Sequence, residues 1–447
     1  MTVRRVPPTA IAVAVAAALS IACSPADSRP NLVLILADDL GYRDVSIHGG
    51  GIPTPEIDQL AASGVRFTQA YSTSSVCAPS RAAILTGRYQ NRFGFEFNLL
   101  EAAQAEAVAP GLPTSETTLA ELLSGAGYKS AIIGKWHLGL ASRFSPLSRG
   151  FDEFFGSLWS SLPYFPADKK RRVLIRGHQP HVEDEYLTDA FTREAVDFIA
   201  RNRDDPFFLF LSYTAPHTPM QATRESMKGC GAWRGSRRRY CGMVRSLDHG
   251  VGRVLRALRE HGIEDETLVV FTNDNGGASN NSADNRPLRG FKGGMYEGGL
   301  RVPMMMRWGG RIAEGTIYAA PVSTLDIFAT FLAAAGAASP PRPIDGVDLL
   351  PFLSDPASGT PHPSLFWRRG PRSAVRVDDW KLVRRGASLE LFNLASDPRE
   401  RLDLSARDPR RVEALERAYA AWQSEMVQPS WKEMKPGRPA PMRERAK

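Results

Sequence analysis

The feature that most constrains the fold is a repeated alternation of short apolar runs with helical patterns. The apolar runs, each typical of a buried strand, are Leu32–Leu36, Ala131–Ile133, Phe207–Leu211 and Leu268–Thr272. Between them, apolar residues at helical spacing predict helices over 119–126, 187–199 and 244–258. Strand, helix, strand in repetition predicts an α/β fold, with a mainly parallel central sheet flanked by helices on both faces.

The pattern changes near Pro361. Shorter segments separated by turn residues follow it, at Ser373–Val377, Trp380–Val383 and Leu389–Asn393, and a helical pattern covers Arg411–Trp422. We therefore predict a main domain over 30–360 and a small C-terminal antiparallel α+β subdomain over 361–427. The tail 428–447 is rich in Pro, Lys, Arg and Glu, which predicts flexibility.

The N-terminus has the pattern of a secretory signal. Arg4 and Arg5 precede an apolar stretch from Ala10 to Ala22 that is too short to span a bilayer comfortably. We predict a signal peptide over 1–22 and an exported protein, periplasmic or at the outer surface. Cys23 at the next position leaves a lipid anchor open, although Ser20 stands where lipoprotein signals usually have Leu.

Three cysteines follow the predicted signal: Cys77, Cys230 and Cys241. An exported compartment is oxidising, and Cys230 and Cys241 are close in sequence around a Gly- and Arg-rich stretch. This spacing predicts a local disulfide, with two free buried thiols as the alternative. The pairing leaves Cys77 alone, to be explained by chemistry.

The chain carries a net charge of +8, which favours an anionic partner such as a polyanionic polysaccharide or a nucleic acid. Composition alone does not choose between these. Arginines cluster at Arg234 with Arg237–Arg239, and at Arg368 with Arg369 and Arg372. Such patches are as often solvated faces as binding sites.

Reactive side chains follow every predicted strand of the main domain, in the segments 38–39, 134–137, 216–217 and 273–275. Alone, each segment would indicate a turn or a structural His. In open α/β sheets, however, ligands bind beyond the carboxyl ends of the strands, so together these residues predict one site. Its oxygen ligands would be Asp38, Asp39, Asp274 and Asn275. Oxygen ligands suit a hard cation, and Ca²⁺ is favoured over Mg²⁺ because it tolerates irregular carboxylate sets.

The segment 75–87 places Cys77 at the start of a helix. Pro79 suits the first helical turn, and Ala82–Leu85 continue it. Unpaired backbone amides and the helix dipole attract an anion to that end. Two alternatives stay open for Cys77: a buried structural thiol, or an ordinary thiolate nucleophile with a lowered pKa.

Cys77-Ala78-Pro79-Ser80-Arg81, with Leu85-Thr86-Gly87, resembles the signature of the type I, formylglycine-dependent sulfatases of the alkaline phosphatase superfamily. The resemblance continues through the blocks 38–42, 134–139, 216–219, 274–277, 292–299 and 391–400. One block is looser, with Arg43 and Ser46-Ile47-His48 in place of the family's Gly- and Cys-containing run, which bears on substrate choice. The resemblance implies an alkaline phosphatase-like fold, with 30–360 as the catalytic domain. It also implies hydrolysis of sulfate monoesters, on sulfated carbohydrates or aryl sulfates.

By the same resemblance, a formylglycine-generating enzyme oxidises Cys77 to formylglycine (3-oxoalanine). One hydroxyl of the hydrated aldehyde attacks sulfur, and the other, once deprotonated, lets the sulfated intermediate release sulfate. The residues that would hold a divalent metal are Asp38, Asp39, Asp274, Asn275 and the modified Cys77.

The resemblance also implies the remaining roles. Arg81 and Lys135 would orient the formylglycine, and His137 would be the base that triggers sulfate release. His217 and Lys292, with Lys135, would bind the sulfate group. Protonation of the leaving oxygen would be shared by His217 and Lys292.

Two other functions stay open on the sequence alone. Phosphonate or phosphate ester hydrolases have similar metal and nucleophile motifs. A surface protein that binds sulfated glycans without turnover would result if Cys77 stayed unmodified. We do not expect a nucleic-acid partner.

Overall fold

The structure is a computed structural model that describes residues 1–2, 29–99, 110–166 and 173–433. The predicted signal peptide and Cys23 therefore lie outside the described residues, apart from Met1 and Thr2. Within the described part of the chain, no helix combines the length and apolar character needed to cross a membrane.

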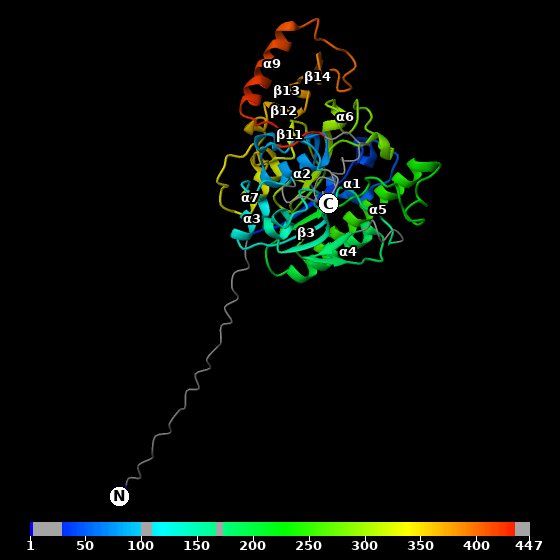
Figure 1. Cartoon of the computed structure of the whole chain (residues 1–447). Coiled ribbons are helices and arrows are strands. Elements are labelled where there is room, and N and C mark those ends of the chain that lie inside the picture. Colours follow the sequence, from blue (N-terminus) through cyan, green and yellow to red (C-terminus); the bar gives the residue numbers. More distant parts are fainter. Residues whose placement is uncertain (3–28, 100–109, 167–172, 434–447) are drawn as a thin grey trace, which may run out of the picture.

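One large sheet forms the centre of the molecule, with the strand order β10-β2-β9-β8-β1-β7-β3-β4-β5-β6 and β11 beside β2 (Figure 1). Its parallel centre consists of β8 (Thr267–Asn273), β1 (Asn31–Ala37), β7 (Phe207–Ser212), β3 (Lys129–Lys135) and β4 (Glu153–Ser157). The outer strands are β2 (Val65–Tyr71), β9 (Arg301–Arg307), β10 (Thr316–Tyr318), β11 (Val322–Ser323), β5 (Leu174–Arg176) and β6 (Gln179–His181). Antiparallel pairs involve β9, β5 and β6. The predicted mainly parallel sheet is confirmed, and the four apolar runs form its adjacent strands β8, β1, β7 and β3.

Helices cover both faces of this sheet, and the alternation of side chains along β1 explains why. Val33 and Ile35 point into a core shared with α1 (Pro55–Ala62), α4 (Leu187–Asn202) and α5 (Gly235–Glu260). Leu32 and Leu34 point into the opposite core, shared with α2 (Cys77–Thr86), α3 (Leu119–Gly125) and α7 (Asp326–Ala334). A strand that is apolar on both sides needs such cover on both faces. Two short helices, α6 (Glu297–Leu300) and α8 (Leu350–Ser354), lie in the connections.

The C-terminal subdomain is a four-stranded antiparallel meander covered by one helix. Its elements are β12 (Ser364–Arg369), β13 (Arg372–Val377), β14 (Trp380–Arg385), β15 (Ser388–Asn393) and α9 (Pro409–Ser424). The sequence did not predict β12, because its final arginines obscure the strand pattern. Arg368 is nevertheless buried there, with its guanidinium 2.8 Å from Glu96 of the main domain.

The two parts share a core, and a buried ion cluster lies at their contact. Tyr71 and Leu300 of the main domain pack with Trp367 and Phe392 of the subdomain. Beside them, Lys381 Nζ lies 2.8 Å from Glu297 and 2.9 Å from Glu400. We call Lys381, Glu297 and Glu400, together with Tyr71, whose hydroxyl donates to Glu297 at 2.7 Å, the Lys381 cluster.

The predicted flexible tail divides into two parts. Residues 428–433 contact the main body: Ser430 N donates to Gly94 O at 2.9 Å, and the Trp431 ring lies 4.8 Å from that of Phe95. Residues 434–447 lie outside the described residues. A disulfide joins Cys230, in the loop before α5, to Cys241, in the first turns of α5, as the sequence predicted.

Candidate functional site

The predicted site residues follow the carboxyl ends of four adjacent parallel strands. Asp38 and Asp39 come directly after β1, and Asp274 and Asn275 directly after β8. Lys135 is the last residue of β3, while His217 follows β7 after a short turn. Because parallel strands end at the same sheet edge, residues far apart in the chain meet there.

Helix α2 brings Cys77 and Arg81 to the same edge. The two residues are four apart, so they lie on one face of the helix. Every residue of α2 is buried, and Cys77 is only 1% exposed. The helix start is also held in place by Asn98, whose side-chain oxygen accepts from Ala78 N at 3.0 Å.

Three carboxylates and the Cys77 thiol form the centre of the site. One ligand atom each from Asp38, Asp39, Asp274 and Cys77 lie within 4.8 Å of one another. The side-chain oxygen of Asn275 is buried beside them and has no hydrogen-bond partner. A buried oxygen without a donor is costly unless a cation or another group meets it. This donor set, rich in carboxylate oxygens, can hold a divalent cation.

Three cationic side chains surround the carboxylates. Lys135 Nζ lies 2.6 Å from Asp38, and an Arg81 guanidinium nitrogen lies 2.9 Å from Asp274. Lys292 Nζ lies 2.8 Å from Asp39 Oδ2 and 2.9 Å from Cys77 Sγ. Burial alone would lower the pKa of Lys292, but Asp39 and Cys77 raise it well above its ordinary value. Lys292 is therefore positively charged at neutral pH, next to the thiol.

The two histidines differ in how they are held. His217 Nδ1 lies 2.7 Å from Thr218 O, which fits an Nδ1–H donor and directs Nε2 toward Asp39, 3.5 Å away. Burial lowers the pKa of His217, although Asp38 and Asp39 oppose the shift. Burial and the charge of Lys135 hold the pKa of His137 well below its ordinary value, and its buried Nδ1 has no partner. Burial therefore favours the neutral form of both imidazoles.

The environment of Cys77 does not favour an ordinary thiolate. Burial, reinforced by Asp274, raises the pKa of its thiol above the usual value, although Lys135 and Lys292 act in the opposite direction. A thiol nucleophile would need the reverse shift. Cys77 is also the free cysteine among the described residues.

The structure adds two residues that the sequence did not place at the site. Arg369 and Arg372, at the turn between β12 and β13, each direct a guanidinium nitrogen to Gly293 O at 3.1 Å, next to Lys292. The sequence showed this arginine patch but contained no signal for its position, because a hairpin turn far along the chain brings it to the site.

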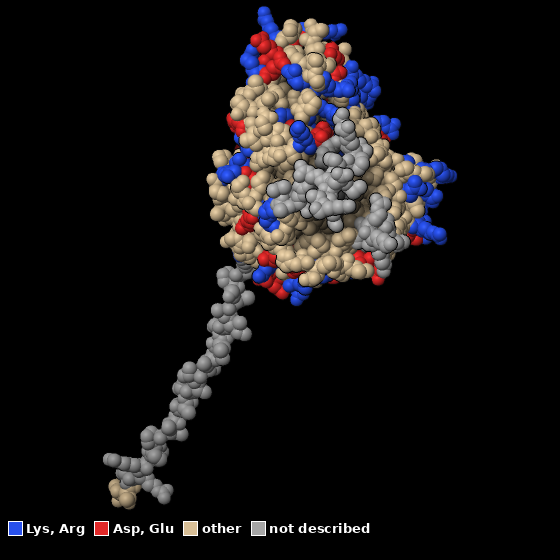
Figure 2. Space-filling view, viewed as in Figure 1, with Lys and Arg blue, Asp and Glu red and all other residues tan. Residues whose placement is uncertain are grey.

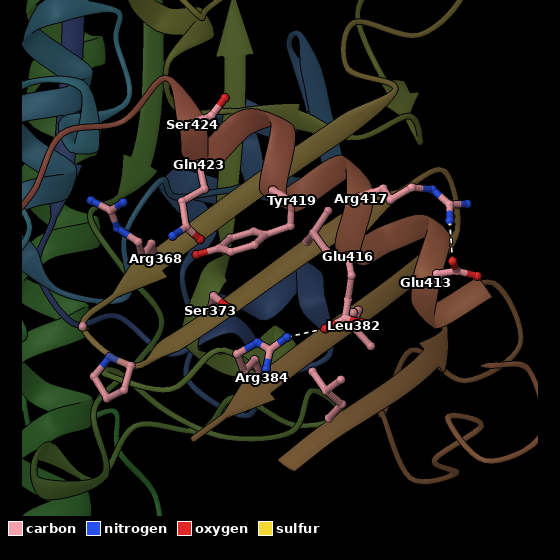
Figure 3. A pocket seen from close by; sticks show the side chains of 15 residues that line it. Arg368, Ser373, Leu382, Arg384, Glu413, Glu416, Arg417, Tyr419, Gln423 and Ser424 are labelled. Atoms are coloured by element: carbon pink, nitrogen blue, oxygen red, sulfur yellow. Dashed lines mark hydrogen bonds and ion pairs between the residues drawn. The ribbon is translucent and has the colours of Figure 1, made fainter. Parts of the chain in front are cut away.

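A separate cavity lies inside the C-terminal subdomain, between α9 and the four-stranded sheet (Figure 3). It has a volume of 820 Å³. Four of its charged side chains pair with each other, Arg384 with Glu416 and Arg417 with Glu413, as the dashed lines in Figure 3 indicate. The fifth, Arg368, pairs with Glu96 of the main domain. It offers no cluster of reactive groups comparable to the one around Cys77.

The model of the family described as "Sulfatase" matches residues 30–337. The chain belongs to the sulfatase family. A second model, "N-sulphoglucosamine sulphohydrolase, C-terminal", matches residues 291–417 of this sulfatase. N-acetylgalactosamine-6-sulfatase of Mus musculus is 34% identical to it over 487 residues, covering 95% of this chain and 90% of the relative. The family and its relatives identify the protein as a sulfuric ester hydrolase.

Solved structures agree with the fold. The sulfatase superposes on Ps i-CgsB in complex with k-i-k-neocarrahexaose with a TM-score of 0.85 and 36% identity, over 91% of this chain and 95% of that one. The phosphonate monoester hydrolase of Agrobacterium radiobacter, at 21% identity and a TM-score of 0.61 over 89% and 95% of the two chains, shares the fold alone. The predicted alkaline phosphatase-like fold and sulfatase family are confirmed.

Proposed function

We propose that this sulfatase removes sulfate ester groups from sulfated glycans, using a formylglycine made from Cys77 and a bound Ca²⁺. One observation carries the proposal: Cys77 is buried at the start of α2, within 4.8 Å of three carboxylate groups and 2.9 Å from Lys292. An isolated structural thiol does not need these neighbours. The relatives support the substrate class, since one is named for N-acetylgalactosamine 6-sulfate and a solved neighbour binds a neocarrahexaose.

Charge balance supports an anionic substrate. Asp38, Asp39 and Asp274 are offset by the cationic groups of Arg81, Lys135 and Lys292. A divalent cation would therefore leave the site with a surplus of positive charge, which suits a sulfate ester. Ca²⁺ would be held by Asp38, Asp39, Asp274 and Asn275, and when bound it would polarise the attacking hydroxyl and offset charge on sulfate. Mg²⁺ suits this crowded carboxylate set less well.

The residues around Cys77 can perform the remaining steps. The hydrated aldehyde supplies two hydroxyls, one to attack sulfur and one that, once deprotonated, expels sulfate. Arg81, anchored on Asp274, and Lys135, anchored on Asp38, would hold that group in position. Neutral His137 would accept the proton from the second hydroxyl. His217 and Lys292 would bind the sulfate, and the departing alcohol oxygen would take its proton either from Lys292 or from a His217 that has first been protonated at Nε2.

Mass spectrometry of the peptide containing Cys77, after expression with a formylglycine-generating enzyme, tests the modification. We expect loss of the thiol and gain of an aldehyde in the active fraction. Turnover by a preparation in which the peptide keeps an unmodified thiol throughout would overturn the formylglycine proposal.

Two kinetic comparisons test the substrate. 4-Nitrophenyl sulfate should be hydrolysed faster than the matched 4-nitrophenyl phosphodiester, and a much larger rate on the phosphorus ester would contradict the assignment. Sulfate release from sulfated oligosaccharides, measured by ion chromatography, should exceed release from simple aryl sulfates at equal concentration. The reverse order would exclude a glycan as the preferred substrate.

Export is a further part of the proposal. Its support is the N-terminal signal pattern, together with the Cys230–Cys241 disulfide, which suits an oxidising compartment. The intact mass of the mature protein distinguishes cleavage after Ala22 from lipid attachment at Cys23. A mature protein that retained residues 1–22 would contradict both.

A further inference from the structure

A pocket with no assigned role lies on the outer side of the loops that carry the site. It has a volume of 640 Å³. Three segments line it: the loop after β1 with Arg43 and Gly51, the start of α5 with Trp233 and Arg237, and residues 282–291 after β8. In Figure 2, Lys and Arg side chains gather along the right-hand edge of the molecule, where Figure 1 places the segments around α5.

The pocket is built from the same loops as the Cys77 site. Arg43 lies four residues after Asp39, and Phe291 immediately precedes Lys292. Asn285, in the pocket wall, connects the loop after β1 to the loop after β8. Its side-chain oxygen accepts from Tyr42 N and from Gly277 N, both at 3.1 Å. Gly277 O in turn accepts from Lys292 N at 3.1 Å. The pocket and the Cys77 site are therefore formed by the same connected loops.

The lining of the pocket has an excess of positive charge. Arg43 and Arg286 share one carboxylate, Asp284, at 3.7 and 2.7 Å. The Arg286 side chain is 74% exposed and that of Arg43 is 37% exposed, whereas Asp284 is 15% exposed. Arg286 contacts both oxygens of Asp284, at 2.9 and 2.7 Å, whereas Arg43 contacts that carboxylate only at 3.7 Å. One carboxylate therefore faces two accessible guanidinium groups, and guanidinium groups bind planar and tetrahedral oxyanions well.

Arg237 has a different role in the pocket wall. Its guanidinium lies 2.6 Å from the fully buried Asp44 and contacts the rings of Trp233 and Tyr240, at 4.9 and 5.1 Å from their centroids. These contacts make Arg237 a structural support. Arg43 and Arg286 are left as the groups suited to bind a ligand.

An exposed aromatic ring completes the pocket. Phe291 is 42% exposed although it is large and apolar. An aromatic surface beside arginines suits a ligand that has both an apolar face and an anionic group. A sulfated sugar has both, because its ring presents C–H groups on one face.

We propose that this pocket is a second glycan subsite, in which Arg43 and Arg286 bind a sulfate group on a sugar next to the one being desulfated, while Phe291 contacts the ring. The inference rests on the proposed glycan substrate. It also gives a role to Arg43, one of the residues by which the block 38–48 departs from the family pattern.

The test uses the double variant Arg43→Gln/Arg286→Gln in the full-length, matured protein. The probes are 4-nitrophenyl sulfate as the reporter substrate and a hexasaccharide with two sulfates per disaccharide as its competitor. We expect the inhibition constant of the hexasaccharide to rise about tenfold or more, because charge-assisted hydrogen bonds to sulfate are lost. The reporter kcat/KM should stay within about twofold, since 4-nitrophenyl sulfate is too small to reach the pocket.

Matched controls separate the subsite from general charge effects. Arg203→Gln removes another arginine that is 49% exposed, near the end of α4, and should leave the inhibition constant unchanged. A hexasaccharide of the same length with one sulfate per disaccharide should show a smaller change in the double variant. Phe291→Ser gives a second, charge-neutral variant, which should weaken hexasaccharide binding a few-fold.

An unchanged inhibition constant in the double variant would overturn the subsite, as would a parallel loss of turnover of the reporter. Failure of the wild type to hydrolyse any sulfate ester would instead reject the proposed function. In that case, calorimetric titration of wild type and double variant with the hexasaccharide still decides the subsite. Equal affinities would reject it.

Discussion

The Cys77 site and the Lys381 cluster are both made of buried charges, yet they differ in what they leave unpaired. In the Lys381 cluster, one ammonium group lies within 3 Å of both carboxylates, at 2.8 and 2.9 Å. At the Cys77 site, the carboxylates are also paired, but the Asn275 oxygen and His137 Nδ1 are buried without partners. Glu400 Oε1 of the Lys381 cluster also lacks a hydrogen bond, but the ammonium of Lys381 lies 2.9 Å from it. Buried polar atoms that no charge meets mark a place for a ligand, whereas an ion cluster joins two parts of the chain.

The electrostatics of the two regions show the same difference. In the Lys381 cluster, burial raises the pKa of Glu400 to about 7. Although burial opposes it, Lys381 lowers the pKa of Glu297 to about 2. The Lys381 ammonium is thus shared by Glu297 and Glu400, in the buried contact between the main domain and the subdomain. Substitutions in this cluster should change stability, and substitutions around Cys77 should change turnover.

Cys77→Ala gives the largest expected effect. It removes the precursor of the nucleophile, so kcat/KM for 4-nitrophenyl sulfate should fall by roughly 10⁴-fold or more. The melting temperature should stay close to that of the wild type, because a small residue still fits the start of α2. Residual turnover near the wild-type level would show that Cys77 is not the nucleophile.

Lys381→Met should change the stability of the protein and leave turnover intact. Two buried carboxylates would lose their shared cation, and the free energy of unfolding should fall by about 3–5 kcal/mol. Chemical denaturation measures this change, with Lys228→Met as control, since its ammonium pairs with Glu225 on the surface, where both side chains are more than 70% exposed. Activity per folded molecule should remain. Loss of activity without loss of stability would remove the distinction between the two regions.

Removal of divalent cations tests whether Asn275 and the three carboxylates bind a metal ion. Prolonged chelation should reduce turnover on the order of 100-fold, because the group that offsets charge on sulfate is lost. Added Ca²⁺ should restore activity better than Mg²⁺. In Asn275→Ala, equilibrium dialysis should show weaker Ca²⁺ binding. Equal binding by this variant and the wild type would exclude Asn275 as a ligand.

The smallest predicted effect concerns a second charged contact at the start of the subdomain. His362 lies 2.7 Å from Asp326 of α7. Burial would lower the pKa of His362, but Asp326 raises it above its ordinary value of 6.5. The stabilisation is therefore complete below about pH 6.5 and is lost as the pH rises through the higher folded-state pKa.

His362→Gln should accordingly lower the melting temperature more at pH 5.5 than at pH 9. Turnover at a fixed pH should be unaffected. A destabilisation that is the same at both pH values would show that the imidazole is not charged in the folded protein.

The sequence predicted the centre of the sheet because its strands obey simple rules. β1, β7 and β8 are apolar on both faces, so their runs stand out from the helices around them. Polar residues directly after such strands must meet at one edge, which is how Asp38 and Asp274 could be placed together. The arginine of the segment 77–81 could be assigned only through family resemblance.

Buried charges away from the strand ends could not be predicted in this way. Lys381 pairs with Glu297 across 84 residues, and Arg368 pairs with Glu96 across 272. A charged residue in a strand reads as exposed unless its partner is known, and the partner is set by tertiary packing. For the same reason, the sequence predicted neither β12 nor the hydrogen bond from Arg369 to Gly293 O.

Cys77 and Lys292, which are in contact in the folded protein, are synthesised at different times. The two residues are 215 positions apart, so at usual rates of synthesis roughly 10–40 s pass between them. During that interval β8 and the Lys292 loop are still being made, and α2 lacks part of its cover. Folding then leaves Cys77 1% exposed. An enzyme that modified Cys77, as proposed above, would therefore reach this side chain more easily in the unfolded chain than in the folded protein.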